Sequence, residues 1–145
     1  MSTIVVGVDG SAEATRALAW ALEEAAVRNG RESVIHAYSA PVPYEAYYAA
    51  GAHWPEMAEE ARKAAEELLQ EVIGAAEVPA GVEVTSQIVE QVNPARALIE
   101  ASESAAMVVV GSRGRGGFAG LLLGSVSQQV VHHARCPVVV VPHDT

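Results

Sequence analysis

The sequence predicts an α/β fold in which an open, doubly wound, parallel sheet of five strands carries helices on both faces. Two observations lead to this prediction. Short runs of apolar, mostly β-branched residues alternate five times with segments whose apolar residues recur at helical spacing. Runs such as 107–110 are apolar throughout, which is typical of parallel strands covered on both faces. Such strands are joined by right-handed helical crossovers.

The composition is that of one ordinary globular domain, residues 1–145. Hydrophobic residues make up 50% of the chain and charged residues 19%, which suffices to bury a core without disulfides or metal. The single cysteine, Cys136, excludes an internal disulfide and suits a reducing compartment. The N-terminus lacks a leader pattern, and no apolar run approaches the roughly 18 residues that span a bilayer. We therefore expect a cytoplasmic protein without a membrane partner.

The chain opens with a predicted strand over 3–9 and a helix over about 11–29. Ser11 is a favourable N-cap, and the apolar residues that follow it recur on one helical stripe. A second strand is predicted over 33–38. The segment 39–54 contains three of the four tyrosines, and the sequence assigns it no role.

Cap residues indicate where the later helices start. Pro55 and Pro94 suit the first turn of a helix, and Asn93 is a favourable N-cap before Pro94. The remaining predicted elements are a helix over 55–73, an edge strand over 82–89, a helix over 94–104, a strand over 107–110, a helix over 125–134 and a strand over 137–142.

A glycine-rich connection before the last helix is the strongest functional signal. Six of the 12 glycines lie between Gly111 and Ser125, in a connection longer than the roughly two to six residues usual in α/β units. Glycine lets backbone N–H groups approach a ligand closely, and a helix N-terminus favours anions. The segment is therefore predicted to hold phosphate, with hydroxyls from Ser125 and Ser127. The alternative is an unconstrained surface loop.

Asp9 lies at the carboxyl end of the first predicted strand. If that strand neighbours 107–110, Asp9 is at the edge where doubly wound sheets bind ligands. A carboxylate beside phosphates implies a bridging Mg²⁺ or a hydrogen bond to ribose. Alternatively, Asp9 caps a local turn with Gly10. The net charge is −9, yet residues 104–143 contain three arginines and no acid. This charge balance argues against nucleic acid and allows an anion near the glycine-rich connection.

The motifs of other known phosphate, phosphoacceptor and metal sites match this sequence poorly. The glycine-rich connection lacks the Gly-Lys-Ser/Thr ending of a Walker A loop and lies too late for a dinucleotide fingerprint. A response-regulator receiver needs further acids and a lysine near its last strand, but the single lysine is Lys63. His132 and His133 are adjacent, about 100° apart on a helix, and are not expected to chelate one metal.

The chain resembles the universal stress protein family, whose ATP-binding signature matches the spacing Gly111-x2-Gly114-x9-Gly124-Ser125 with Val126-Ser127 after it. The segments 4–11, 34–37 and 136–141 also look like that family, so the resemblance covers essentially the whole chain. It implies a Rossmann-like, adenine nucleotide alpha hydrolase-like fold with strand order 3-2-1-4-5. It also implies ATP in the crevice between strands one and four, and dimers.

The resemblance further implies which residues form the site. Gly7 and Asp9 would lie beside ribose and phosphates, and the backbone of Ala37 would meet adenine. Apart from the resemblance, Asp9 is the one candidate Mg²⁺ contact, through the phosphates, with the hydrogen bond to ribose as the alternative. No catalytic residue is predicted. The expected nucleotide-binding residues are Gly7, Asp9, Ala37, Gly111, Ser112, Arg113, Gly114, Arg115, Gly116, Gly117, Gly124, Ser125, Val126 and Ser127.

The predicted function is an ATP-binding regulatory module of the stress response with at most slow hydrolysis, because no residue is evidently placed to activate water. Two alternatives stay open. One is an adenine-nucleotide-dependent enzyme similar to ATP pyrophosphatases, and the other is a structural dimer that binds no nucleotide. In the implied strand order, Val138–Val141 forms an apolar sheet edge, which is predicted to pair in a homodimer.

Overall fold

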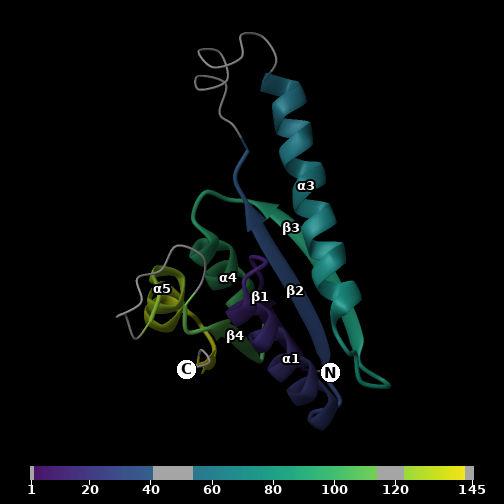
Figure 1. The fold of residues 1–145 in the computed structure, drawn as a ribbon. Helices are drawn as coiled ribbons and strands as arrows, with labels where there is room; N and C mark the ends of the chain where they lie inside the picture. The colour runs from purple at the N-terminus through teal and green to yellow at the C-terminus, as the bar shows by residue number, and fades with distance from the viewer. Residues whose placement is uncertain (1, 41–53, 114–122, 143–145) are drawn as a thin grey trace.

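The computed structural model describes residues 2–40, 54–113 and 123–142. Strands and helices alternate through these residues as the sequence predicts (Figure 1). In chain order the elements are β1 (Thr3–Gly7), α1 (Ala12–Val27), β2 (Arg31–Tyr38), α3 (Trp54–Ala75), β3 (Glu83–Glu90), α4 (Pro94–Ser102), β4 (Met107–Gly111), α5 (Ser125–His133) and β5 (Val138–Val141).

The five strands form one parallel sheet in the order β3-β2-β1-β4-β5, which confirms the predicted fold class. β1 is the central strand and pairs with β2 on one side and β4 on the other. In the register, Val6 of β1 lies opposite Val34 of β2 and Val109 of β4. The strand order reverses direction between β1 and β4, and sheets of this type bind ligands at that switch point.

Each face of the sheet has its own hydrophobic core, because successive side chains along a strand point to opposite faces. On one face, Ile4 and Val6 pack with residues of α1 and α3. On the other face, Val5 packs with residues of α4 and α5. Both faces of the central strands are therefore covered, as their continuous apolar sequence predicts.

The predicted caps start two of the helices. Ser11 accepts a hydrogen bond from the N–H of Ala14 at 3.2 Å and caps α1. Asn93 accepts one from the N–H of Ala95 at 3.1 Å and caps α4. Both caps place their helices so that the first turns adjoin the carboxyl edge of the sheet.

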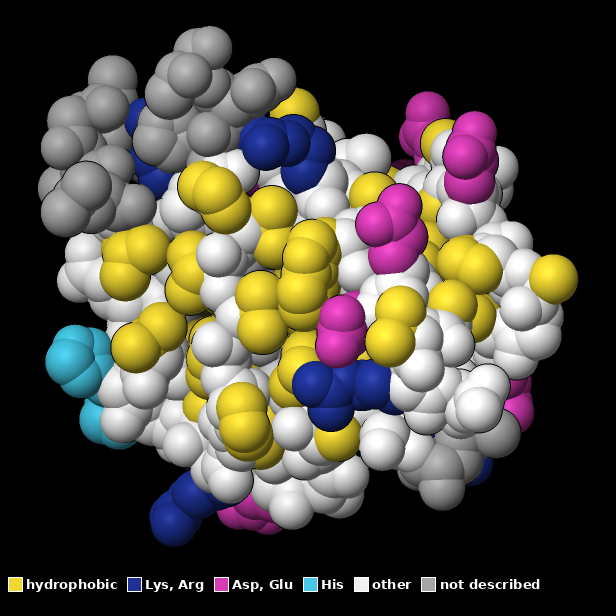
Figure 2. All heavy atoms as spheres, turned by 90° about the horizontal axis from the view of Figure 1, so that it is seen from below, with side chains coloured by type: hydrophobic (Ala, Val, Ile, Leu, Met, Phe, Trp, Pro, Cys, Tyr) yellow, Lys and Arg dark blue, Asp and Glu magenta, His cyan; other side chains and the backbone are white. Residues whose placement is uncertain are grey.

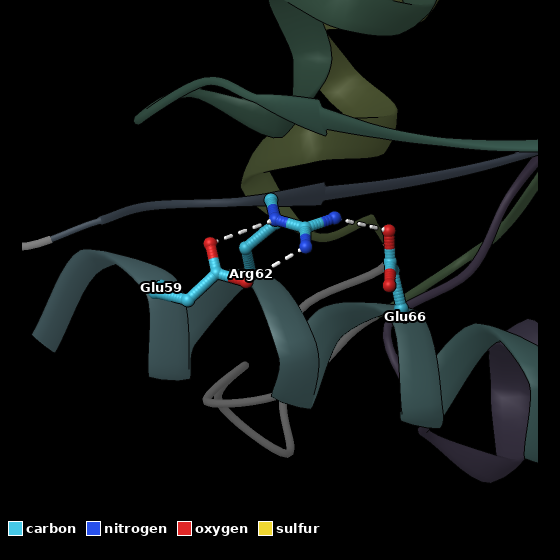
Figure 3. Close-up of polar contacts among 3 residues, drawn as sticks. All are labelled: Glu59, Arg62 and Glu66. Carbon is cyan, nitrogen blue, oxygen red and sulfur yellow. Dashed lines mark hydrogen bonds and ion pairs between the residues drawn. The ribbon is translucent and has the colours of Figure 1, made fainter. Parts of the chain in front are cut away.

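Exposed charged side chains of α3 form a small ion-pair cluster. Arg62 bridges Glu59 and Glu66, with 2.8 Å between its Nη2 and Oε1 of Glu59 (Figure 3). The hydrogen bond from Arg62 lowers the pKa of Glu59. These bridges are exposed and add little stability, whereas Ala65 and Leu69 of the same helix are buried. Among the described residues, no helix is both long and apolar enough to cross a membrane.

The two edges of the sheet differ in polarity. β3 exposes Thr85, Ser86 and Gln87 and is the edge strand that the sequence predicts. β5 forms the other edge with Val138–Val141, all four partly exposed. From below, hydrophobic side chains gather across the middle of the molecular surface with few charged groups among them (Figure 2).

Glu32 is a carboxylic acid buried in the sheet. It lies in β2 between Ile4 of β1 and Val84 of β3, and its exposed fraction is 0%. Neither carboxyl oxygen has a hydrogen-bond partner among the described residues. Burial raises the pKa of Glu32 to about 9, because an ion is poorly solvated there. Glu32 is therefore protonated in the folded protein at neutral pH.

This burial makes stability depend on pH. The folded protein keeps the Glu32 proton up to about pH 9, whereas the unfolded chain releases it near the ordinary pKa of 4.5. Stability is therefore lost as pH rises from 4.5 toward 9. At pH 8, we expect Glu32→Gln to raise the free energy of unfolding by about 1–3 kcal/mol and to flatten its pH dependence, because each pKa unit corresponds to about 1.4 kcal/mol.

Urea unfolding at pH 5 and pH 8 measures this difference. Glu83→Gln is the matched control, since Glu83 is an exposed acid on the neighbouring strand. A Glu32→Gln variant with the same pH dependence as the wild type would contradict the assignment of a buried neutral acid.

Candidate functional site

The candidate site lies at the carboxyl ends of β1 and β4. α1 follows β1 and packs on one face of the sheet, and α5 follows β4 and packs on the other (Figure 1). A helix N-terminus carries partial positive charge and unpaired N–H groups. Two such termini adjoin this edge. That of α1 is capped by Ser11 and carries Glu13 in its first turn, whereas that of α5 has no acid in its first turn, so an anion is favoured from the α5 side.

Asp9 shapes the turn between β1 and α1. β1 ends at Gly7, two residues earlier than predicted, although the N–H of Val8 still donates to the Ile35 carbonyl at 2.9 Å. The chain then turns at Gly10, whose φ is 85°. Oδ1 of Asp9 accepts the N–H of Ser11 at 2.9 Å. The turn-capping role that the sequence left open for Asp9 is therefore present.

Ser112, the first residue after β4, is held in place by several hydrogen bonds. Its N–H donates to the Val141 carbonyl of β5 at 2.9 Å. Its carbonyl accepts the N–H of Gly124 at 2.6 Å and the hydroxyl of Ser127 at 3.0 Å. Ser112 and Ser127 are both buried. The residues flanking the glycine-rich connection are therefore bonded directly to each other.

Gly111 lies where the end of β4 meets the first turn of α1. A methyl group added at Gly111 would lie 3.1 Å from the backbone carbonyl carbon and oxygen of Glu13, in the first turn of α1. This is closer than ordinary van der Waals contact. The absence of a side chain at the end of β4 therefore allows the first turn of α1 to approach it.

Gly7 serves a similar purpose on the opposite face. A methyl group there would lie 2.7 Å from Cδ1 of Leu98 in α4. The sequence suggests that a ligand or another backbone comes close to Gly7, but the close neighbour in the structure is a leucine side chain. Helix packing therefore accounts for this glycine without any ligand.

The start of α5 offers backbone N–H groups. Its N-cap is Gly124, which makes no side-chain capping hydrogen bond in the part of the chain that the structure describes. Ser125 is exposed at the first helical position, and Val126 after it is half-buried. A glycine cap with no acid in the first helical turn leaves room for an external anion.

The end of β2 contributes a residue that the sequence analysis did not select. His36 is buried, and its Nδ1 lies 2.8 Å from the carbonyl oxygen of Val8. Since a carbonyl only accepts, Nδ1 carries the proton and donates. This bond ties the exit of β1 to the residue before Ala37. The only sequence signal for it is a histidine inside an apolar strand.

The structure thus places most predicted site residues around one edge. The described members are Gly7, Asp9, Ala37, Gly111, Ser112, Arg113, Gly124, Ser125, Val126 and Ser127. The predicted residues Gly114, Arg115, Gly116 and Gly117 lie outside the residues that the structure describes. Asp9 is half-buried at the turn after β1, and Ser125 is exposed at the start of α5.

Comparison with known proteins identifies relatives along the whole domain. The model of the universal stress protein family matches residues 1–142. Universal stress protein Rv2623 of Mycobacterium tuberculosis is 41% identical over 138 residues, covering 94% of this chain and 44% of that protein. The chain thus spans about half the length of this mycobacterial relative. A universal stress protein of Thermus aquaticus is 38% identical, covering 96% of this chain and 97% of that protein.

A solved structure gives a similar result for the fold. It is described as a universal stress protein in complex with cAMP and is 28% identical to this chain. The TM-score is 0.61, with 99% of this chain and 98% of the other covered.

The contact at Gly111 leads to a prediction about stability. We expect Gly111→Ala to lower the free energy of unfolding by about 1–2 kcal/mol, because the added methyl meets backbone that cannot move away easily. Gly74→Ala is the control, since nothing lies within 4 Å of a methyl group at this position of α3. Alanine favours a helix over glycine, so the control is expected to gain about 0.5–1 kcal/mol. Urea unfolding compares the two, and equal stabilities would disprove the close approach of α1.

Proposed function

This chain belongs to the universal stress protein family, and we propose that it binds an adenine nucleotide, ATP with Mg²⁺, at the carboxyl edge of β1 and β4. The observation that carries the proposal is the start of α5, where a glycine cap leaves first-turn N–H groups beside an edge that α1 also adjoins. The relative described as a complex with cAMP supports an adenine nucleotide as the class of ligand.

We assign each part of the nucleotide to a different group of residues at this edge. The N–H groups of Ser125 and Val126 bind phosphate oxygens, together with the glycine-rich connection that the sequence predicts as an anion cradle. Asp9 faces the ribose and phosphates from the β1 turn. The backbone of Ala37, at the end of β2, contacts adenine. This order follows the strand order, with the base on the β2 side and the phosphates on the β4 side.

Mg²⁺ fits this site as a companion of the phosphates. Among the described residues, no group of three or more His, Cys, Asp or Glu side chains is placed to hold a metal ion. Mg²⁺ is commonly held by one or two carboxylates, with substrate phosphates and water as its other ligands. Asp9 therefore suits Mg²⁺ that arrives with a nucleotide, and when bound the ion neutralises charge between carboxylate and phosphates.

We propose a regulatory role for this site in the cytoplasmic stress response, with at most slow ATP hydrolysis. Binding at the switch point contacts the turns after β1 and β4, so nucleotide occupancy can bias the surface around them. An ATP-pyrophosphatase-like enzyme is the second candidate, and it would use the turn at Asp9-Gly10-Ser11. A structural dimer without nucleotide is the third.

Calorimetric titration with ATP and Mg²⁺, together with a phosphate- and pyrophosphate-release assay, tests the proposal. We expect the wild type to bind without rapid turnover. Ser125→Glu is expected to weaken binding at least tenfold, because a carboxylate at the helix start repels phosphate while suiting the helix itself. Val131→Glu, on the same helix at a residue 47% exposed, is the charge-matched control and should retain binding.

Rapid turnover would favour the enzyme, and absence of binding by the wild type would favour the structural dimer. In the same titration, Asp9→Asn separates charge from turn capping, because the amide oxygen can still accept the Ser11 N–H. A loss of the Mg²⁺-dependent part of the affinity is expected from this variant. Wild-type affinity in Asp9→Asn would leave Asp9 with its turn-capping role alone.

We also propose that the chain forms a homodimer through β5. Its four valines are partly exposed at a sheet edge, and an unpaired apolar edge is prone to association. The β5 strand of a second copy is equally apolar, so the two strands can pair with each other.

Light scattering on a sizing column tests the homodimer. We expect a dimer for the wild type at micromolar concentration and a monomer for Val140→Lys, because the lysine places a charge within the apolar edge. Val92→Lys, at a residue 83% exposed outside the edge, is the control and should remain dimeric. A thermal melt shows that each variant is folded. A monomeric wild type, or a folded dimeric Val140→Lys, would refute the interface.

A further inference from the structure

We infer that Ser127 is a positioning residue for nucleotide binding: its buried hydroxyl fastens the start of α5 to the end of β4. The sequence analysis assigns this hydroxyl to the ligand, but the structure gives it other partners. Oγ of Ser127 lies 3.0 Å from the Ser112 carbonyl oxygen and 3.0 Å from the Gly124 carbonyl oxygen. The exposed fraction of Ser127 is 2%, so the hydroxyl is turned into the protein.

The hydroxyl has one proton to donate, and the two carbonyl oxygens share it. The bond to Gly124 is local, since it spans three residues at the start of α5. The bond to Ser112 is different because it spans 15 residues and joins two separate elements. The same Ser112 carbonyl also accepts a hydrogen bond from the N–H of Gly124, at 2.6 Å. The hydroxyl therefore adds a second link between strand end and helix start.

This link is not needed to satisfy buried carbonyls. The Ser112 carbonyl already accepts the N–H of Gly124, and the Gly124 carbonyl already accepts the N–H of Gln128 at 3.0 Å. Removing the hydroxyl thus leaves neither oxygen without a donor, and the loss of stability is small. What is lost is the fixed position of the first turn of α5 relative to β4.

That position matters for the proposed nucleotide site, on which this inference rests. Ser125 and Val126 lie between Gly124 and Ser127, so the two linked residues bracket the N–H groups offered to phosphate. Groups held in place before binding lose less freedom when the ligand arrives. Ser127 thus raises affinity without touching the nucleotide.

Ser102 provides a matched control. It is also a buried serine, 1% exposed, whose hydroxyl donates to a backbone carbonyl, that of Ile99. It lies in the last turn of α4, at the other end of the sheet from the site. Its oxygen also accepts the N–H of Arg135 at 2.9 Å. Removing this hydroxyl leaves that N–H without its partner, so Ser102→Ala is expected to lose more stability than Ser127→Ala.

The experiment compares the thermal midpoint, the dissociation constant for ATP with Mg²⁺, and amide hydrogen exchange at Gly124 without nucleotide. For Ser127→Ala we expect a dissociation constant at least fivefold higher, faster exchange at Gly124 and a small fall in the midpoint. For Ser102→Ala we expect a larger fall in the midpoint with unchanged affinity. Ser127→Thr retains a hydroxyl and is expected to restore affinity relative to Ser127→Ala.

Each outcome decides the inference. Affinity that follows the thermal midpoint in both alanine variants would overturn it, since loss of stability alone would then explain weaker binding. Unchanged affinity in Ser127→Ala would overturn it as well. Failure of the wild type to bind nucleotide would refute the proposed function itself, and the inference with it. Suppose that only Ser127→Ala loses affinity while amide exchange at Gly124 stays slow. The hydroxyl would then contact the nucleotide directly, which would also overturn the inference.

Discussion

The parallel pairing of β1 with β4 is the constraint on which the rest of this structure depends. Three apolar residues of β1, Ile4 to Val6, lie opposite Met107 to Val109 of β4, and both faces of this pair are covered by helices. The pairing fixes the two carboxyl ends at the same level. The turns that follow, one toward α1 and one toward α5, therefore leave neighbouring strands toward opposite faces, which is where sheets of this type bind ligands.

Two glycines make this arrangement compact. Gly7 is the last residue of β1 and lies next to Leu98 of α4. Gly111 is the last residue of β4 and lies next to Glu13 of α1. Each of these adjacent strands thus has a glycine at its carboxyl end. The missing side chains lie on opposite faces, so a helix can approach the sheet closely on each face. A glycine in a strand weakens the strand locally. Here that weakness is offset by packing that brings helix N–H groups and turn residues close to one another.

The sequence was sufficient for the fold because the fold depends on local patterns. Apolar runs and cap residues such as Ser11 and Asn93 act within one element, and the structure places all nine elements close to their predicted positions. The candidate site was predicted less completely, because several of its bonds join residues far apart in the chain. His36 reaches Val8 and Ser127 reaches Ser112, and neither pattern gives a local signal. Glu32 is a further example, since only tertiary burial makes this acid neutral.

The unequal edges of the sheet limit how copies of this domain can associate. β5 presents valines, whereas β3 presents Thr85, Ser86 and Gln87 and begins and ends with a glutamate. Joining two copies along β5, as proposed, would use the valine edge of both and leave outward the β3 edges, where Thr85, Ser86 and Gln87 are exposed. Growth by repeated addition of strands, as in a fibril, would then have to continue on an edge whose middle residues are polar and exposed. A dimer of this kind would bury the most apolar edge of the sheet and present the more polar one, which is less favourable for further strand pairing.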